Sequence, residues 1–343
     1  MKQEKKIADE KLLRYTEKIL VKRGEKALEM VRQTVLEEKL ECREVQEALQ
    51  YFITEYWYDL ARPTLLSLCC EAAGGKPDAT IPFAVPLSLI SGALDIQDDI
   101  IDQSKTKHGR PTVYGKYGKE IALLAAGALL FKGFTLLQKA CMQIPTEKAT
   151  KIIDLVKNMF YELGDAEAME LKLRGRLDIT EKEYLHIVRK KAADVEAHAR
   201  IGAILGNATT IEEENLANYG RLLGMVIIIR DDILDSLDTK ELKHRMTREH
   251  IPLPLIYALE KEKIARYRLP PNVSLKEFCE EKIETGIEQC NNLLRKLINE
   301  AFIYIKDAPD KHKYHLNLIL KAFKISLIEN KKRRGFSPTS KVE

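Results

Sequence analysis

The sequence predicts an all-α protein, and three observations support this prediction. Apolar residues recur at intervals of three and four along most of the chain, which is typical of amphipathic helices. No stretch combines apolar–polar alternation with the β-branched residues typical of strands, and the turn pairs Asn-Gly and Asp-Gly do not occur. No repeat of fixed period and no low-complexity linker divides the chain, so we predict a single helical domain over residues 1–343.

The first third of the chain divides at its glycines and prolines. Within the N-terminal segment 1–45, residues 8–45 predict two amphipathic helices broken near Gly24. The aromatic-rich residues 46–60 are expected to pack in the core, and Pro63 suits the first turn of the helix that follows. Residues 74–78 predict a loop. A long apolar helix is expected over residues 81–102, where Pro86 can introduce a kink.

The rest of the chain is also helical in pattern. The predicted helices are 120–137, 147–173, 181–205, 211–234, 254–259, 275–304 and 314–330. Residues 104–118, which are polar and rich in glycine, are expected to form a loop. Residues 331–343 are expected to form a basic, flexible tail.

The charge and cysteine patterns exclude several classes of function. The 56 basic and 52 acidic residues balance to a net charge of +4, which gives no argument for a nucleic-acid partner. The six cysteines form no Cys-x-x-Cys pair, so a zinc site is not expected. The N-terminus lacks the apolar segment of a signal peptide, and no uninterrupted apolar run reaches membrane-spanning length. We therefore expect a cytoplasmic protein with no integral membrane segment.

The C-terminal end of the predicted helix 81–102 carries an acidic cluster. Asp95, Asp98, Asp99 and Asp102 fall at i, i+3, i+4 and i+7, so they share one helical face. Carboxylates at this end of a helix interact unfavourably with the helix dipole, at a cost of up to about 1 kcal/mol each. The aspartates therefore do not stabilise the helix, which favours a functional explanation for them. Such a cluster usually needs a cation.

A second acidic cluster repeats the Asp-Asp-x-x-Asp spacing in Asp231, Asp232 and Asp235. Hard oxygen ligands on helices suit Mg²⁺, which commonly binds one or two carboxylates together with substrate phosphates. Gly-rich phosphate-binding loops are absent from the sequence, so metal and basic side chains must hold any diphosphate. A solvated helix face is the alternative interpretation of either cluster, but two copies of the spacing favour a Mg²⁺–diphosphate site. The basic loop 104–118, which includes Lys107 and His108, is expected to lie over the first cluster.

These motifs together resemble the trans-isoprenyl diphosphate synthases, or polyprenyl synthetases. The resemblance covers roughly residues 60–259. Besides the two aspartate motifs, it rests on Arg62-Pro63, on Gly109-Arg110-Pro111-Thr112, on Lys190 in place of a Lys-Thr pair and on residues 253–258, Leu-Pro-Leu-Ile-Tyr-Ala.

The resemblance implies an orthogonal bundle of helices around a deep central cavity, with Mg²⁺ ions held between the two motifs. It implies that the metal ions promote ionisation of an allylic diphosphate and that the double bond of isopentenyl diphosphate attacks the resulting cation. The implied metal ligands are Asp98, Asp99, Asp102, Asp231, Asp232 and Asp235. The implied catalytic residues are Asp98, Asp99, Asp102, Lys190 and Asp231. The implied substrate-binding residues are Arg62, Lys107, His108, Glu167, Lys190 and Lys191. A homodimer is also implied.

The departures from the family pattern concentrate on the isopentenyl diphosphate side. Asp59 stands where the family has Lys, Ser91 where it has His, and His108 where it has a second Arg. Glu249-His250 replaces a Gly-Lys pair, and Ala166-Glu167 replaces a Gly-Gln pair. The allylic side therefore resembles the family closely, whereas the acceptor side does not.

Three hypotheses for function follow. The leading one is a Mg²⁺-dependent prenyltransferase that condenses an allylic diphosphate with isopentenyl diphosphate to a longer linear product. The second is a class I terpene cyclase or a prenyltransferase with a non-standard acceptor. The third is a partner subunit of a heteromeric synthase. The role of Asp95, which belongs to no recognised motif, stays open.

Overall fold

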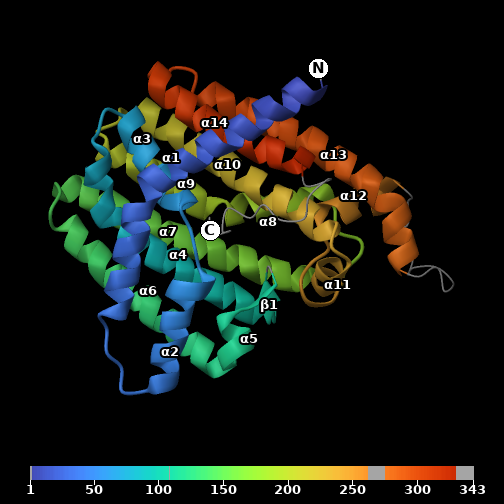
Figure 1. The fold of residues 1–343 in the computed structure, drawn as a ribbon, viewed down its shortest axis with the longest axis horizontal. Coiled ribbons are helices and arrows are strands. Elements are labelled where there is room, and N and C mark those ends of the chain that lie inside the picture. Colours follow the sequence, from blue (N-terminus) through green and yellow to red (C-terminus); the bar gives the residue numbers. More distant parts are fainter. Residues whose placement is uncertain (1, 108, 262–274, 330–343) are drawn as a thin grey trace.

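The computed structural model describes residues 2–107, 109–261 and 275–329, and it confirms the predicted all-α fold (Figure 1). The helices, in chain order, are α1 (Lys2–Leu36), α2 (Arg43–Tyr51), α3 (Ala61–Ala72), α4 (Ile81–Ile101), α5 (Val113–Tyr117), α6 (Lys119–Cys141), α7 (Thr146–Leu173), α8 (Glu181–Lys191), α9 (Ala193–Leu205), α10 (Thr210–Ser236), α11 (Thr239–Arg248), α12 (Leu253–Lys261), α13 (Leu275–Tyr304) and α14 (Asp310–Glu329). A π-helical turn, Phe52–Tyr56, extends α2, and a 3-10 turn, Pro77–Thr80, precedes α4.

Two long apolar helices, α4 and α10, carry the acidic clusters and are fixed by the core. Helix α4 packs mainly against α6, and α10 packs against α9 and α13. Ile90 and Ile96 of α4 and Val226 and Ile229 of α10 have no solvent exposure. Burial of such side chains stabilises the fold by about 1.5–3 kcal/mol each, so the core holds both aspartate-bearing helix ends in place.

Helix α1 corrects the expectation of two helices broken near Gly24. It runs without interruption through this glycine, and it lies beside α14 along one edge of the molecule (Figure 1). A Cβ atom at position 24 would lie 2.8 Å from the carbonyl oxygen of Leu60. The glycine therefore permits close approach of the segment before α3 and does not end a helix.

Helix α4 continues through Pro86 as a single helix, as predicted. Two other segments differ from the sequence predictions. The predicted helix 181–205 divides at Ala192 into α8 and α9. The expected loop 104–118 contains α5 and a hairpin of two short antiparallel strands, β1 (Thr106–Lys107) and β2 (Arg110–Pro111). Strands of this length leave no alternating pattern in a sequence. The tail 331–343 lies outside the described residues.

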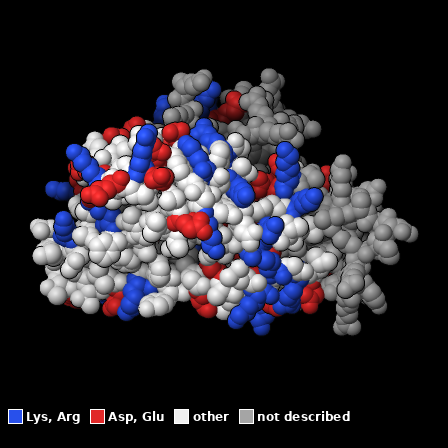
Figure 2. Space-filling view, turned by 90° about the horizontal axis from the view of Figure 1, so that it is seen from below, with Lys and Arg blue, Asp and Glu red and all other residues white. Residues whose placement is uncertain are grey.

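The surface carries both signs of charge. Figure 2 shows Lys and Arg side chains interspersed with Asp and Glu over the face that it presents, as the balanced composition predicts. Two helical segments, Pro77–Ile101 and α6, are long and apolar enough to cross a membrane by length and composition alone. The apolar window of the first is 72% buried within the protein and that of the second 33%. Core helices of soluble proteins meet the same criteria, so this finding does not indicate a membrane segment.

Candidate active site

The first acidic cluster lies at the C-terminal end of α4, against the β1–β2 hairpin. Lys107 of β1 places its Nζ atom 3.0 Å from Asp98 Oδ2 and 2.8 Å from Asp99 Oδ1. The hairpin pairs Lys107 with Arg110 across a turn whose Gly109 has a φ of 74°. The predicted contact between the basic segment and the acidic helix end is therefore present, and the hairpin fixes it.

The carboxylates of this cluster share a setting that disfavours their joint ionisation. Burial, with help from Asp98 and Glu249, raises the pKa of Asp102 to about 9. Burial also raises the pKa of Asp99 to about 6, although Lys107 opposes the shift. Burial acts in the same direction on Asp98, but Lys107 and Lys191 outweigh it and lower its pKa. The cluster therefore favours an added cation.

Lys191 of α8 connects the first cluster to two glutamates of α7. Its Nζ atom lies 2.9 Å from Glu167 Oε1 and 3.8 Å from Asp98 Oδ1, and it also pairs with Glu170. Glu170 is buried, and its other oxygen lies 2.7 Å from His250 Nδ1. Lys191 and His250 hold the pKa of Glu170 well below its usual value, although burial opposes them. Glu170 was not predicted from the sequence, although it follows Glu167 by three residues and so shares its helical face.

Lys190, for which the resemblance implies a catalytic and substrate-binding role, contacts α7: its Nζ atom lies 2.8 Å from Asp165 Oδ2. The neighbouring Lys191 is the lysine that contacts Asp98. Consecutive residues of an α-helix point about 100° apart, so only one of the two neighbouring lysines can face the cluster, and it is Lys191. His108, the other predicted basic group, lies outside the described residues.

The second acidic cluster lies near the end of α10, and its three aspartates differ in setting. Asp232 is 1% exposed, and its carboxylate accepts hydrogen bonds from the hydroxyl of Tyr184 at 2.6 Å and from the backbone N–H of Leu253 at 2.9 Å. It also lies 2.8 Å from Arg245 Nη2. Asp232 therefore takes part in the packing of α8, α11 and α12, whereas the resemblance implies that it is a metal ligand. Asp231, by contrast, has a side chain that is 52% exposed.

Helix α11, which was not predicted from the sequence, places Arg245 at the centre of this cluster. Arg245 Nη1 lies 3.0 Å from Asp235, and Nε lies 2.9 Å from Glu249. Asp238 caps the helix by accepting from the N–H groups of residues 240 and 241 at 2.8 and 3.4 Å. An Asp followed three residues later by Glu241 is a capping signal that could have revealed this helix from the sequence.

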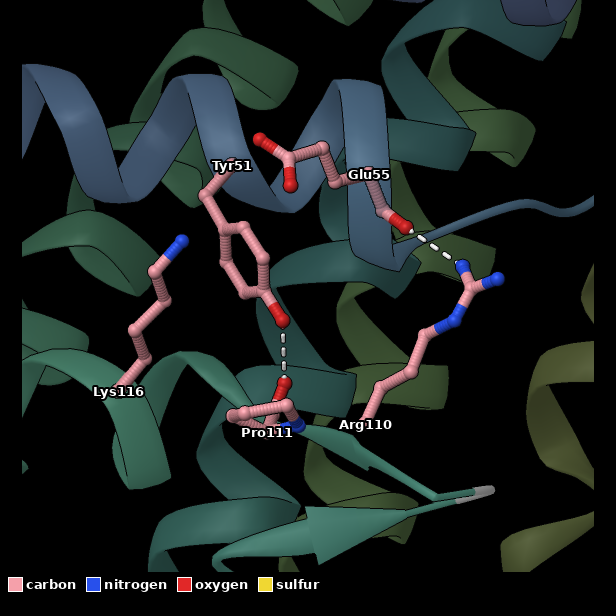
Figure 3. Close-up of a pocket in the computed structure, with 5 residues that line it drawn as sticks. All are labelled: Tyr51, Glu55, Arg110, Pro111 and Lys116. Atoms are coloured by element: carbon pink, nitrogen blue, oxygen red, sulfur yellow. Dashed lines mark hydrogen bonds between the residues drawn. The ribbon is translucent and has the colours of Figure 1, made fainter.

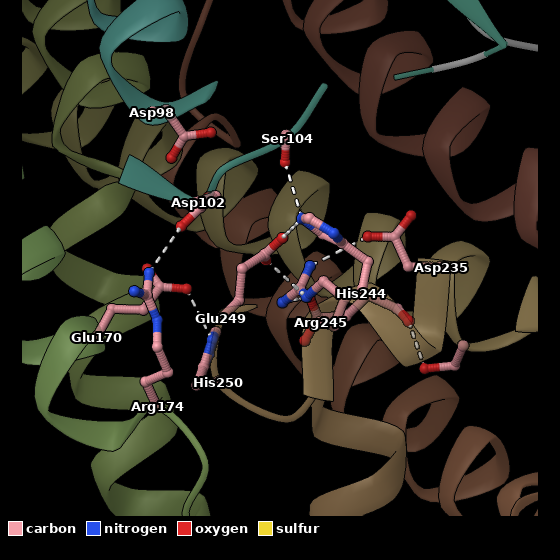
Figure 4. A network of polar contacts seen from close by, with 12 residues as sticks. Asp98, Asp102, Ser104, Glu170, Arg174, Asp235, His244, Arg245, Glu249 and His250 are labelled. Atoms are coloured by element: carbon pink, nitrogen blue, oxygen red, sulfur yellow. Dashed lines mark hydrogen bonds and ion pairs between the residues drawn. The ribbon is translucent and has the colours of Figure 1, made fainter. Parts of the chain in front are cut away.

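Helix α11 also joins the two acidic clusters into one polar network, shown in Figure 4. Ser104, just after the first cluster, bonds His244 Nε2 at 3.1 Å, and Arg248 donates to the side chain of Gln103 at 2.8 Å. Glu249, which follows α11, is close enough to Asp102 of the first cluster to help raise its pKa, and Figure 4 shows both residues in the same network. The clusters, which are separated by more than a hundred residues in the sequence, therefore border one region.

Arg62 lies beside this region in a cage of three carboxylates, which we name the Arg62 cage. Its Nε atom is 2.5 Å from Asp194, Nη1 is 2.9 Å from Asp59, and Nη2 is 3.6 Å from Asp95. Ser91 donates to Asp194 at 3.1 Å, so two of the residues that depart from the family pattern, Asp59 and Ser91, belong to this group. Asp194 was not expected from the sequence.

The residues present fit a divalent metal ion bound together with an anion. The donor groups are carboxylate oxygens, and Glu167 Oε2 is buried with no hydrogen-bond partner among the described residues. Within the part of the chain that the structure describes, no three Asp, Glu, His or Cys side chains form a ready-made ligand set. Mg²⁺ commonly completes its shell with substrate phosphates and water, which agrees with this arrangement.

A separate pocket of about 410 Å³ lies between α2 and the hairpin (Figure 3). Tyr51 donates to the carbonyl of Pro111 at 2.6 Å, and Arg110 donates to the carbonyl of Glu55 at 2.9 Å. Lys116 Nζ lies 3.7 Å from the centre of the Tyr51 ring. These contacts tie the hairpin that carries Lys107 to α2.

Comparisons with known proteins agree with this fold and these motifs. A model of the polyprenyl synthetase family matches residues 43–290. The chain is 34% identical to a geranylgeranyl diphosphate synthase of Methanosarcina mazei over 181 residues, which are 52% of this chain and 55% of that one. It is 31% identical to a short chain isoprenyl diphosphate synthase of Methanothermobacter thermautotrophicus over 224 residues, which are 65% and 67% of the two chains. The first of these matches spans little more than half of the relative's length.

Solved structures share the fold over nearly the whole chain. The geranylgeranyl pyrophosphate synthetase of Geoglobus acetivorans superposes with a TM-score of 0.78 at 23% identity, covering 89% of this chain and 99% of that one. The synthetase of Pyrococcus horikoshii gives 0.76 at 24% identity, covering 90% and 98%.

Proposed function

This chain belongs to the polyprenyl synthetase family, and from that premise we propose that it is a prenyltransferase that condenses an allylic diphosphate with isopentenyl diphosphate to a longer linear isoprenyl diphosphate. The observation that carries the proposal is the joining of two Asp-Asp-x-x-Asp motifs, from α4 and α10, in one polar network with Lys107 and Lys191 beside the first motif. The named activities of the relatives, geranylgeranyl and short chain isoprenyl diphosphate synthases, support it.

Magnesium is the proposed cofactor. When bound, it would stabilise the charge of the departing diphosphate, and the residues proposed to hold it are Asp98, Asp99, Asp102, Asp231 and Asp235. A polyprenyl synthase of Caulobacter crescentus with a TM-score of 0.74 and 19% identity has been solved with calcium and isoprenyl diphosphate. A complex that holds a divalent ion together with an isoprenyl diphosphate supports a divalent cofactor for this chain.

The chain's own cations are proposed to bind the allylic diphosphate. Lys107 and Lys191 already face the first cluster, and each has three N–H donors for phosphate oxygens. The neighbouring carboxylates raise the pKa of both lysines well above the usual value, although burial opposes this, so both are charged at neutral pH. A bound diphosphate would replace carboxylate contacts with charge-assisted bonds to phosphate. The acceptor is proposed to bind near Arg62.

We also propose a cytoplasmic homodimer. Helix α6 exposes a continuous apolar face at Leu123, Leu124 and Phe131, whose exposed fractions are 54%, 58% and 76%. Leu124 and Phe131 are seven positions apart and so share one side of the helix, and Leu123 lies next to Leu124 at the border of this side. A contiguous apolar face of this kind is typical of an interface between protein chains.

The proposal is tested by incubating the purified protein with Mg²⁺, an allylic diphosphate and labelled isopentenyl diphosphate. We expect labelled, elongated product. Release of diphosphate without incorporation of label would instead support a cyclase or another acceptor. Activity that begins only when a second polypeptide is added would support the partner-subunit alternative.

A further inference from the structure

Asp95 differs from the other two carboxylates of the Arg62 cage. Its side chain is 42% exposed, whereas those of Asp59 and Asp194 are 11% and 9% exposed. Its contact with Arg62 is also the longest of the three, at 3.6 Å. Asp95 is therefore the carboxylate that a ligand can reach and displace.

The two less exposed carboxylates, Asp59 and Asp194, make contacts within the fold that do not depend on any ligand. Asp59 accepts from the backbone N–H groups of Ala61 and Arg62 at 2.7 and 3.2 Å, so it caps the first turn of α3. Asp194 joins α9 to α4 through Ser91, and it lies 3.2 Å from His198 Nδ1. Two of the three nitrogens of Arg62 are thus occupied by the fold itself.

The remaining nitrogen, Nη2, forms its ion pair with Asp95. Asp95 lies one turn before Asp98 and Asp99, so it adds a like charge to a cluster that is already crowded. Its other oxygen accepts from Trp57 Nε1 at 2.8 Å, which fixes the carboxylate over the guanidinium.

We propose that Asp95 is an acceptor-specificity residue, which occupies Nη2 of Arg62 and thereby weakens the binding of a diphosphate-bearing acceptor. The proposal rests on the proposed function, in which the acceptor is isopentenyl diphosphate and Arg62 is the cation that receives it. A carboxylate at this edge acts in two ways against the acceptor, because it competes for Nη2 and because it repels the incoming diphosphate. The proposed allylic site uses Lys107 and Lys191, which contact Asp98 and not Asp95, so these lysines take no part in the competition for Arg62.

The test compares the wild-type protein with Asp95→Asn, which removes the charge but keeps an oxygen for the Trp57 N–H. Asp154→Asn, a charge removal on the exposed surface of α7, is the matched control. Binding of isopentenyl diphosphate is measured by calorimetry with a chelator present and no allylic substrate. The fluorescence of Trp57, which is the single tryptophan of the chain, gives a second measure in each protein. KM values for both substrates are then measured with Mg²⁺.

We expect Asp95→Asn to bind isopentenyl diphosphate at least about tenfold more tightly than wild type, with a matching fall in its KM. The KM for the allylic diphosphate and the properties of Asp154→Asn should stay within about twofold of wild type. Unchanged or weaker acceptor binding in Asp95→Asn would overturn the inference, because Asp95 would then merely orient Arg62. If Asp95→Asn gains affinity but neither protein elongates an allylic substrate, the proposed function fails and the inference about Asp95 holds.

Discussion

Arg245 provides a quantitative test of how the second acidic cluster is held together. The change is Arg245→Met, which keeps much of the side-chain length but removes the cation that contacts Asp232, Asp235 and Glu249 at 2.8 to 3.0 Å. Removal of one partner from a buried ion pair costs about 3–5 kcal/mol, because a buried charge is left uncompensated. Asp232 keeps its bonds from Tyr184 and Leu253, so we expect the lower end, about 3 kcal/mol.

The assay is thermal unfolding with a chelator present, so that bound metal does not contribute. A loss of 1 kcal/mol shifts Tm by about 2–4 °C in chains of 150–250 residues and by less in longer ones, so the expected fall is roughly 5 °C. Arg248→Met on the same helix is the control, because its partner Gln103 is exposed, and it should change Tm by about 1 °C. If the two variants melt within about 1 °C of each other, Arg245 does not hold this cluster together.

Two further predictions concern the metal and the oligomer. Asp102 has a pKa of about 9, so in the metal-free protein at neutral pH its carboxyl group keeps a proton that a divalent ion must displace. Metal affinity, measured in the presence of an allylic diphosphate analogue, should therefore rise by up to about tenfold per pH unit between pH 7 and pH 8.5. Calorimetry in two buffers of different ionisation enthalpy should detect the released proton, and Asp102→Asn should abolish that release; equal affinities at both pH values would refute the assignment. Leu124→Asp, on the exposed face of α6, should convert the dimer to a monomer, as measured by light scattering. The control Lys119→Asp, at the start of the same helix, should leave the dimer intact. A dimer that survives Leu124→Asp would place the interface elsewhere.

The sequence was most informative where local pattern decides the structure. The apolar periodicity placed α13 at its observed bounds, 275–304, and α4 within one residue at its end. The aspartate spacing identified both clusters because i, i+3 and i+4 relations follow from helix geometry alone. The contact of Lys107 with the first cluster followed from its position in a basic segment directly after the helix.

Tertiary contacts decided what the sequence could not. Gly24 is typical of a helix break, but it permits close packing against Leu60 within a continuous helix. The choice between Lys190 and Lys191 depended on which side of α8 faces α4, which the pattern of two adjacent lysines leaves open. Asp194 and Arg245 come from separate helices and acquire their roles only when those helices pack beside α3 and α10. Asp95 belonged to the predicted acidic face, but its contact with Arg62 could not be predicted from the sequence.

The claim that both aspartate motifs act on one diphosphate is tested most directly by the rate of isoprenyl elongation in Asp98→Asn and Asp231→Asn. Asp154→Asn serves as the control for loss of one surface charge. The account predicts that each motif variant loses at least about a hundredfold in kcat while the control retains wild-type turnover. Wild-type turnover in either motif variant would contradict it.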